Sequence, residues 1–158
     1  MRKRLIIGNW KMNMLRQEAA ELARRLCGTI RSSDVDVVIA PPYTSLEAVY
    51  EVIQGTNIGL GAQDVFWENS GAFTGEISPY MLIDAGCRHS ERRVILGETD
   101  DMVRKKVRAS LSSGLIPVLC VGETLEEREK GKTMRVIDRQ IENGLRDLSL
   151  DTPDKITI

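Results

Sequence analysis

The sequence predicts an α/β fold built on a parallel sheet, in a single domain over residues 1–158, and three observations support it. Short apolar runs, bounded by Gly, Pro, Asn or Asp, show no polar–apolar alternation, which is typical of strands covered on both faces. Longer stretches between these runs carry apolar residues at helical spacing. The two patterns alternate along the chain, as they do in repeated βαβ units with right-handed crossovers.

Apolar runs mark the predicted strands. The order along the chain is β-α-β-α-β, then a loop, then further helices separated by one more strand, and a last strand begins at the end of the sequence. The predicted strands are Leu5-Ile6-Ile7, Val37-Val38-Ile39-Ala40, Ile58-Gly59-Leu60, Ile116-Pro117-Val118-Leu119-Cys120-Val121 and Ile156-Thr157-Ile158.

Two apolar stripes at spacings of three and four residues predict amphipathic helices. The stripe in the C-terminal part gives the clearest helix of the chain. The stripes are Leu15, Ala19, Leu22, Leu26 and Ile30, and then Met134, Ile137, Ile141, Leu145 and Leu148.

Capping residues set the ends of three more predicted helices. Each helix opens on a Ser or Thr and ends at a glycine. The first helix runs from Ser78-Pro79 through Ala85 and is ended by Gly86. The second opens at Thr99-Asp100-Asp101, continues with Val103, Val107 and Leu111, and is stopped by Gly114. The third opens with the capping box of Thr124 and Glu127 and is closed by Gly131.

Composition narrows the class of protein. The 22 Lys and Arg residues nearly balance the 23 Asp and Glu residues, so the net charge of −1 gives no electrostatic drive toward nucleic acid or an anionic membrane. The three scattered cysteines, Cys27, Cys87 and Cys120, form no disulfide framework or metal motif and suit a reducing compartment. No run is long enough for a signal peptide or a membrane span, so we expect a cytoplasmic location and no membrane partner.

Two glycine-containing motifs are weak signals for phosphate binding. Gly59-Leu60-Gly61 follows a strand, but Asp64 stands where a dinucleotide fingerprint needs its third glycine. Gly131-Lys132-Thr133 has Glu126 in place of the first glycine of a P-loop and follows a helix. We interpret neither as a nucleotide site.

His89 and Lys11 are candidates for chemistry. His89 is the only histidine, and Ser90-Glu91 after it resembles a helix entry, which would favour a neutral, hydrogen-bond-donating imidazole. Lys11 directly follows the first strand, at the edge of a parallel α/β sheet where ligands bind. A structural histidine and a solvated lysine are the ordinary alternatives. The cluster Arg104-Lys105-Lys106 is interpreted as a solvated helix face.

Seven segments, in order along nearly the whole chain, resemble triosephosphate isomerases. They are Gly8-Asn9-Trp10-Lys11-Met12-Asn13, Ala40-Pro41-Pro42, Gly61-Ala62-Gln63-Asp64, Gly71-Ala72-Phe73-Thr74-Gly75-Glu76-Ile77-Ser78, His89-Ser90-Glu91-Arg92-Arg93, Gly97-Glu98-Thr99 and Cys120-Val121-Gly122-Glu123-Thr124.

The resemblance implies a homodimeric (β/α)8 TIM barrel that interconverts dihydroxyacetone phosphate and glyceraldehyde 3-phosphate through an enediolate, without a cofactor or metal. It implies that Asn9 and Lys11 contact the phosphorylated triose, with Lys11 stabilising negative charge. It also implies that His89 polarises the carbonyl as a catalytic residue, supported by Ser90 and Glu91. Thr74 falls in the loop that enters the partner subunit.

The chain departs from the family pattern in two places. A TIM barrel needs about 250 residues, so the strands after the sixth, and the segment with the glutamate base, are expected to be absent. The apolar run that should precede His89 is also missing, a gap of about five residues or roughly 17 Å of strand. We therefore expect an incomplete barrel, open or rearranged because the later strands and the fourth strand are missing. The alternative to an isomerase is a non-catalytic remnant or gene fragment.

The gap before His89 leads to a geometric expectation. If the helix over 78–85 is intact, Gly86, Cys87 and Arg88 span at most about 11 Å, too little to bring His89 to the end of the sheet where Lys11 lies. We expect Val94-Ile95-Leu96 to take the vacant strand position, because this keeps apolar groups buried. The alternative is a shortened helix that exposes part of Met81, Leu82 and Ile83.

Overall fold

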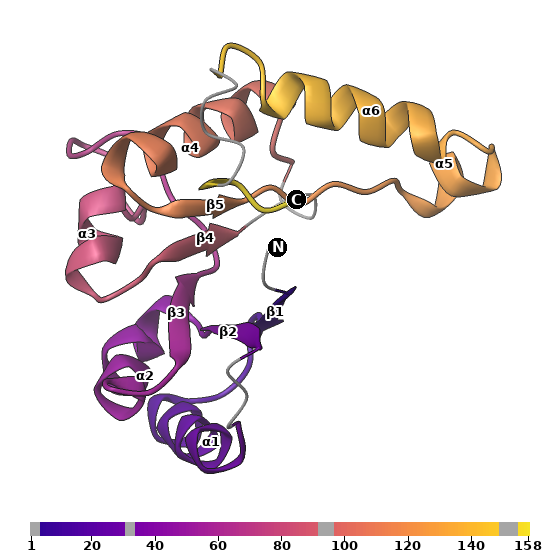
Figure 1. The fold of residues 1–158 in the computed structure, drawn as a ribbon. Coiled ribbons are helices and arrows are strands. Elements are labelled where there is room, and N and C mark those ends of the chain that lie inside the picture. The colour runs from indigo at the N-terminus through magenta and orange to yellow at the C-terminus, as the bar shows by residue number, and fades with distance from the viewer. Residues whose placement is uncertain (1–3, 31–33, 92–96, 149–154) are drawn as a thin grey trace.

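The computed structural model describes residues 4–30, 34–91, 97–148 and 155–158 and contains one curved parallel sheet (Figure 1). The strand order is β1-β2-β3-β4-β5, each strand parallel to its neighbour. The strands are β1 (Arg4–Asn9), β2 (Val35–Ala40), β3 (Ile58–Ala62), β4 (His89–Glu91) and β5 (Ile116–Val118). The predicted class, an incomplete (β/α)8 barrel, is confirmed.

Helices connect successive strands, as the βαβ pattern predicts. The helices are α1 (Arg16–Thr29), the 3-10 turn η1 (Tyr43–Ser45), α2 (Leu46–Ile53), α3 (Pro79–Asp84), α4 (Asp100–Ser113), α5 (Leu125–Glu129) and α6 (Thr133–Gly144). In Figure 1, α1 and α2 lie together on one side of the sheet, and α5 reaches away from it at the far end of α6. No described helix is long and apolar enough to cross a membrane.

The caps predicted from the sequence close the helices as expected. The Ser78, Thr99 and Thr124 hydroxyls accept hydrogen bonds from the third residue beyond, and Thr124 and Glu127 form the reciprocal capping box. After α3 the chain turns at Gly86, whose φ of 84° is left-handed and whose added Cβ would stand 2.4 Å from the Tyr50 ring. The helix predicted over 78–85 is therefore intact.

The buried stripe of α6 differs from the predicted one. Met134 is exposed, and the buried residues are Val136, Gln140 and Gly144. Gly144 packs against Leu119, and the Gln140 amide exchanges two hydrogen bonds with the main chain of Gly122. These long-range contacts rotate the buried face away from the stripe that periodicity alone indicates, and the helix ends at Gly144 rather than near Leu148.

The fourth strand of the sheet is made of His89, Ser90 and Glu91, which is the main departure from expectation. His89 pairs with Gly61 on one side and Ile116 on the other. The backbone of Arg88 already bonds to Leu60 and Ile116, because only four residues, 85–88, separate α3 from β4. The prediction that Val94-Ile95-Leu96 fills this position is wrong. Those residues lie outside the described ranges.

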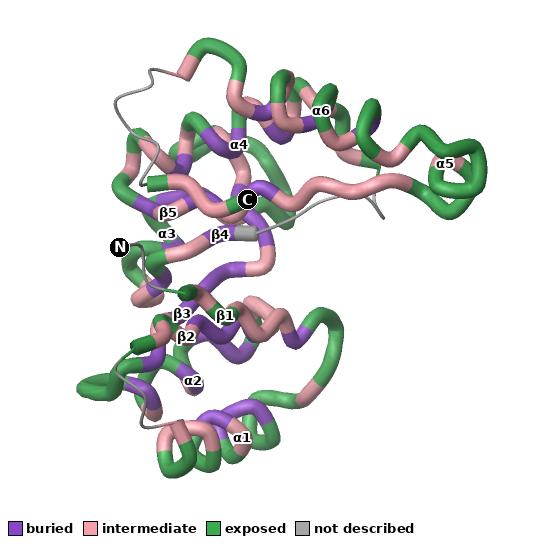
Figure 2. The backbone as a smooth tube through the Cα atoms, turned by 45° about the vertical axis from the view of Figure 1, so that its right-hand side comes forward, coloured by how far each residue is buried: buried purple, intermediate pink, exposed green. Residues whose placement is uncertain are grey.

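Two clusters of buried apolar residues pack against the sheet, and the first extends past β4 to Leu115, next to β5. The first cluster joins β2 and β3 to α1, α2 and α3, and the second joins α4 to the segment after β5. Figure 2 shows buried segments along the sheet and on the inner sides of the helices, with α5 exposed. The buried members of the second cluster are Val103, Val107 and Leu119.

Candidate functional site

Asn9 and Lys11 form a tight turn at the end of β1. The Asn9 side-chain oxygen accepts a hydrogen bond from the Lys11 main-chain N–H at 2.8 Å. Lys11 is exposed and has a φ of 53°, a left-handed conformation that is costly for a residue with a side chain. The turn therefore places a cationic side chain in solvent beside the carboxyl end of the first strand.

Gln63, which follows β3, holds this turn in place. Its Nε2 donates hydrogen bonds to the Lys11 carbonyl at 2.8 Å and to the Ala40 carbonyl at 2.9 Å. The Gln63 side chain thus connects three neighbouring segments: the turn after β1, the end of β2 and the residue that follows β3. Sequence reasoning assigned Gln63 no role, and the only available signal was its place in the Gly61–Asp64 segment.

His89 lies at the beginning of β4, away from Lys11. It lines an open cavity of about 820 Å³, here called the hollow. The hollow is built mainly from residues at the beginnings of strands, among them Leu5, Asp36, Asn57, Arg88 and Ile116. Asn9 and Lys11, at the other end of β1, are not among the described residues that line it. This placement agrees with the position expected for His89 behind an intact 78–85 helix.

The imidazole of His89 is held in its neutral form by burial rather than by a helix. Desolvation, reinforced by the Arg88 charge, lowers the pKa of His89 below its usual value, and the charge of Asp36 opposes this shift. The expected helix entry at Ser90-Glu91 is wrong, because both residues belong to β4. His89 Nδ1 is buried and has no hydrogen-bond partner in the described part of the chain.

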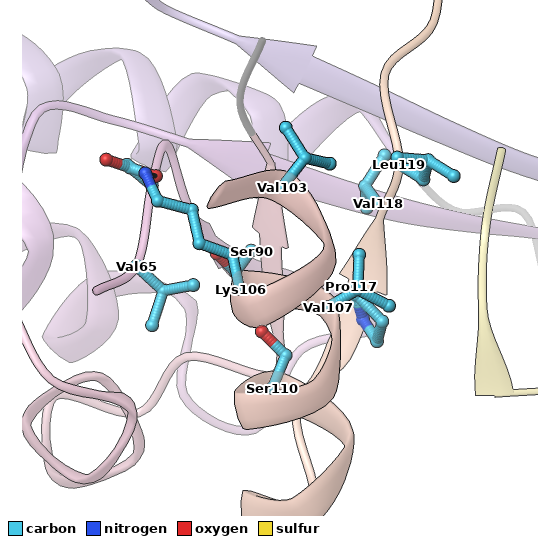
Figure 3. A pocket seen from close by; sticks show the side chains of 10 residues that line it. Val65, Ser90, Val103, Lys106, Val107, Ser110, Pro117, Val118 and Leu119 are labelled. Carbon is cyan, nitrogen blue, oxygen red and sulfur yellow. Dashed lines mark hydrogen bonds and ion pairs between the residues drawn. The ribbon is translucent and has the colours of Figure 1, made fainter. Parts of the chain in front are cut away.

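Ser90 is buried between the sheet and α4. It lines a second cavity of about 20 Å³, here called the small cavity, together with Val65, Val103, Val107 and Ser110 (Figure 3). The Ser110 hydroxyl, also buried, lacks a hydrogen-bond partner within the described residues. Glu91 ends β4 opposite Val118. Ser90 makes no hydrogen bond to the His89 side chain among those that the structure describes.

A buried ion cluster lies next to the small cavity. The Lys106 ammonium contacts Asp64 at 2.7 Å and also Glu98, with all three side chains at most 10% exposed. The Asp64 carboxylate follows β3, and Figure 3 shows the Lys106 side chain extending from α4. The interpretation of Arg104-Lys105-Lys106 as a solvated face is therefore wrong for Lys106. The spacing of charged residues along a helix does not show which of them is buried, so the sequence did not predict the burial of Lys106.

Thr74 lies on the surface, in the long loop between β3 and α3. Aromatic contacts order this loop: the Phe66 ring stacks on Trp67 with centroids 4.1 Å apart and meets Phe73 at 4.7 Å. The Lys105 ammonium lies 5.3 Å from the Trp67 ring, which ties the loop to α4. Thr74 is thus presented on an ordered, exposed loop.

The described residues thus present an exposed lysine on a fixed main chain at one end of β1 and an imidazole with a lowered pKa in the hollow. No group of three or more His, Cys, Asp or Glu suited to a metal ion occurs among them. The cation can hold an anionic ligand, and the imidazole can exchange a proton with a group that enters the hollow. The two are not placed to act on one small ligand together.

Comparison with known proteins identifies what this chain is similar to. The family model for triosephosphate isomerase matches residues 4–158. A triosephosphate isomerase of Thermoanaerobacter pseudethanolicus is 51% identical over 156 residues, covering 96% of this chain and 63% of the relative. That of Geobacter metallireducens is 49% identical and covers 100% of this chain and 65% of the relative. The chain thus spans less than two thirds of the length of these curated relatives.

A solved structure gives the same answer for the fold. The triosephosphate isomerase of Bartonella henselae superposes with a TM-score of 0.86 at 38% identity, over 98% of this chain and 65% of its own. The alignment to the Geobacter relative has 164 positions for the 158 residues here, so at least 164 − 158 = 6 positions hold a residue of the relative alone.

Proposed function

This chain belongs to the triosephosphate isomerase family, and we propose that it serves the interconversion of dihydroxyacetone phosphate and glyceraldehyde 3-phosphate in glycolysis and gluconeogenesis. The reaction moves a proton between neighbouring carbons through an enediolate and needs positioned acid–base groups. In this proposal the chain supplies the substrate-binding end of β1, where Asn9 and Lys11 contact the phosphorylated triose.

One observation carries the proposal: hydrogen bonds within the protein hold the Lys11 turn. Gln63 and Asn9 fix the main chain on both sides of Lys11 by hydrogen bonds of 2.8 Å. A cation held in place stabilises a phosphate or an enediolate oxygen without reorganisation during the reaction. A merely solvated lysine would not need a strained backbone clamped from β3.

His89 is proposed as the electrophile that polarises the substrate carbonyl, with Ser90 and Glu91 as supporting residues. For that role its imidazole must reach the end of the sheet where Lys11 lies, whereas here it lines the hollow. We therefore propose that a polypeptide of these 158 residues binds a triose phosphate weakly and turns it over far below enzyme rates of about 1–10³ s⁻¹. A homodimer formed through the Thr74 loop is part of the same proposal.

Titration of the 158-residue chain with dihydroxyacetone phosphate, followed by NMR, tests the binding step. Lys11→Met should weaken binding roughly tenfold, because the positive charge that faces the phosphate is lost. Lys130→Met is the matched control, since Lys130 is an exposed lysine paired only locally with Glu126. Equal affinity in the wild type and Lys11→Met would refute the assigned role.

A coupled activity assay separates binding from catalysis. Insertion of five apolar residues between Arg88 and His89 would add roughly 17 Å of strand and carry His89 toward Lys11. We expect no measurable turnover from either polypeptide of this length and tighter triose phosphate binding by the insertion variant. Absence of binding in both would instead favour the non-catalytic remnant.

A further inference from the structure

Hydrogen bonds, rather than packing, hold the turn that follows β1. The side chains of Lys11 and Met12 are exposed, Met12 by 96%, so they add no apolar packing that would keep the main chain in its left-handed conformation. Besides the two side chains described above, a third one bonds to this turn. The Asn13 Nδ2 donates a hydrogen bond to the Trp10 carbonyl at 2.8 Å. Sequence analysis assigned Asn13 no role.

The peptide group between Trp10 and Lys11 is bound at both of its polar atoms. Its carbonyl accepts a hydrogen bond from Asn13, and its N–H donates one to the Asn9 side-chain oxygen. Trp10 is itself anchored, because its N–H donates to the Ala40 carbonyl at 3.0 Å and its side chain is 9% exposed in the first cluster. Two asparagines, each two residues from Lys11 in the sequence, therefore fix the peptide group that sets the φ of Lys11.

These two hydrogen bonds oppose a flip of this peptide group. A half-turn of the peptide plane would take the φ of Lys11 from 53° to 53 − 180 = −127°, a value that residues with side chains adopt readily. The left-handed conformation is the less favourable of the two, so it is kept only while the hydrogen bonds hold. In a flipped peptide, the Trp10 carbonyl would face Asn9 in place of the Lys11 N–H.

The flip would reverse the orientation of the Asn9 amide. In this structure the Asn9 Oδ1 accepts from the Lys11 N–H, so the Nδ2 end of the amide is directed elsewhere as a donor. A carbonyl in place of that N–H would attract Nδ2 instead and turn the amide oxygen outward. An anionic phosphate is bound by donors and repelled by an oxygen. The orientation of the peptide group thus decides whether Asn9 can contact a phosphorylated triose.

We propose that Asn13 is a positioning residue for the binding of the phosphorylated triose. By holding the Trp10 carbonyl, it prevents the peptide flip and keeps the Asn9 amide oriented as a donor. The inference rests on the proposed function of Asn9 and Lys11. Asn13 itself acts only through the main chain.

The conformation of Lys11 is the first measurement, made by NMR without ligand. The nuclear Overhauser effect between the Lys11 amide hydrogen and its own Hα is strong at a left-handed φ and weaker near −127°. Asn13→Leu, which removes the donor, should weaken this signal. Asn13→Asp should do so as well, because it keeps the size of the side chain but a carboxylate cannot donate. Circular dichroism verifies that each variant is folded.

Titration with dihydroxyacetone phosphate is the second measurement. Asn13→Leu should weaken binding about fivefold, because only the unflipped fraction of the chain is competent to bind. Gln17→Leu, which removes an exposed amide at the beginning of α1, is the matched control and should change neither measurement.

An unchanged Overhauser effect in both Asn13 variants would overturn the inference, and so would an unchanged affinity in Asn13→Leu. The first measurement uses no substrate, so its failure is distinct from failure of the proposed function. A wild-type chain with no affinity for dihydroxyacetone phosphate would refute that function, and with it the role of Asn13 in binding.

Discussion

The part of the molecule around β2 and β3 and the part around β4 and β5 are built from the same βα units but are packed very differently. Among the described residues, the first cluster buries fourteen side chains, including Ile39, Leu60 and Leu82. The second cluster buries three. At the boundary, the small cavity separates Val65 of the first cluster from Val103 of the second.

The strands next to the two clusters also differ in composition. β3 is apolar and contains two glycines, and an added Cβ at Gly61 would stand 3.0 Å from the Val38 side chain, so the strands pack closely. β4 consists of His89, Ser90 and Glu91, and Ser90 lines the small cavity between Val65 of the first cluster and Val103 of the second.

The largest effect is expected at the ion cluster, which supports the weaker half. Lys106→Met would leave the buried carboxylates of Asp64 and Glu98 without their cation and should lower the free energy of unfolding by about 3–5 kcal/mol. Urea denaturation measures the loss. Lys105→Met, which removes an exposed ion pair to Asp101 and the contact with the Trp67 ring, should cost no more than about 2 kcal/mol. Similar losses in both would show that burial of Lys106 does not matter.

A substitution at Ser90 should make the packing of the two parts of the molecule more similar. Ser90→Val places apolar atoms in the small cavity and favours the strand, and we expect it to raise the free energy of unfolding by about 1 kcal/mol. Thermal melting measures the gain. Ser110→Ala, on the opposite wall, removes a buried hydroxyl without filling space and serves as the comparison. A loss of stability in Ser90→Val alone would mean that the cavity is too tight to fill.

The smallest effect concerns pH, because His89 is only half-buried. Its pKa is lowered in the folded state by desolvation and by Arg88, so the unfolded chain binds the proton more readily. The contribution of neutral His89 to stability is then complete above the unfolded pKa of about 6.5 and is lost as the pH falls below it. His89→Gln should flatten the dependence of unfolding free energy on pH between about 7.5 and 5. An unchanged slope would contradict this.

Local signals in the sequence were sufficient for most of the first half and for the ends of the three helices with predicted caps. Caps such as Thr99 and Thr124 act within one turn, and the apolar runs of β1, β2 and β3 predict strands without any distant contact. The family resemblance added the barrel and the residues at the end of β1. These features depend on neighbours in sequence or on motifs of several residues.

Features that depend on distant contacts were missed. His89-Ser90-Glu91 carries no strand pattern and forms β4 because α3 leaves only four residues, 85–88, before this strand. The sequence around Lys106 indicates a surface residue, and its burial depends on the contact with Asp64, which lies 42 residues away. The role of Gln63 depends on a carbonyl 52 residues away. In each of these cases the result depends on a contact between residues that are far apart in sequence.

The contact between Gln140 and Gly122 bears on how this region can change during evolution. Because the Gln140 amide bonds to the N–H and carbonyl of Gly122, it recognises main-chain atoms that every residue except proline possesses. Open space surrounds the position that a Gly122 side chain would occupy. Another small residue at position 122 would therefore keep both hydrogen bonds, whereas a substitution of Gln140 would lose them. In diverging sequences we expect position 122 to vary more than position 140.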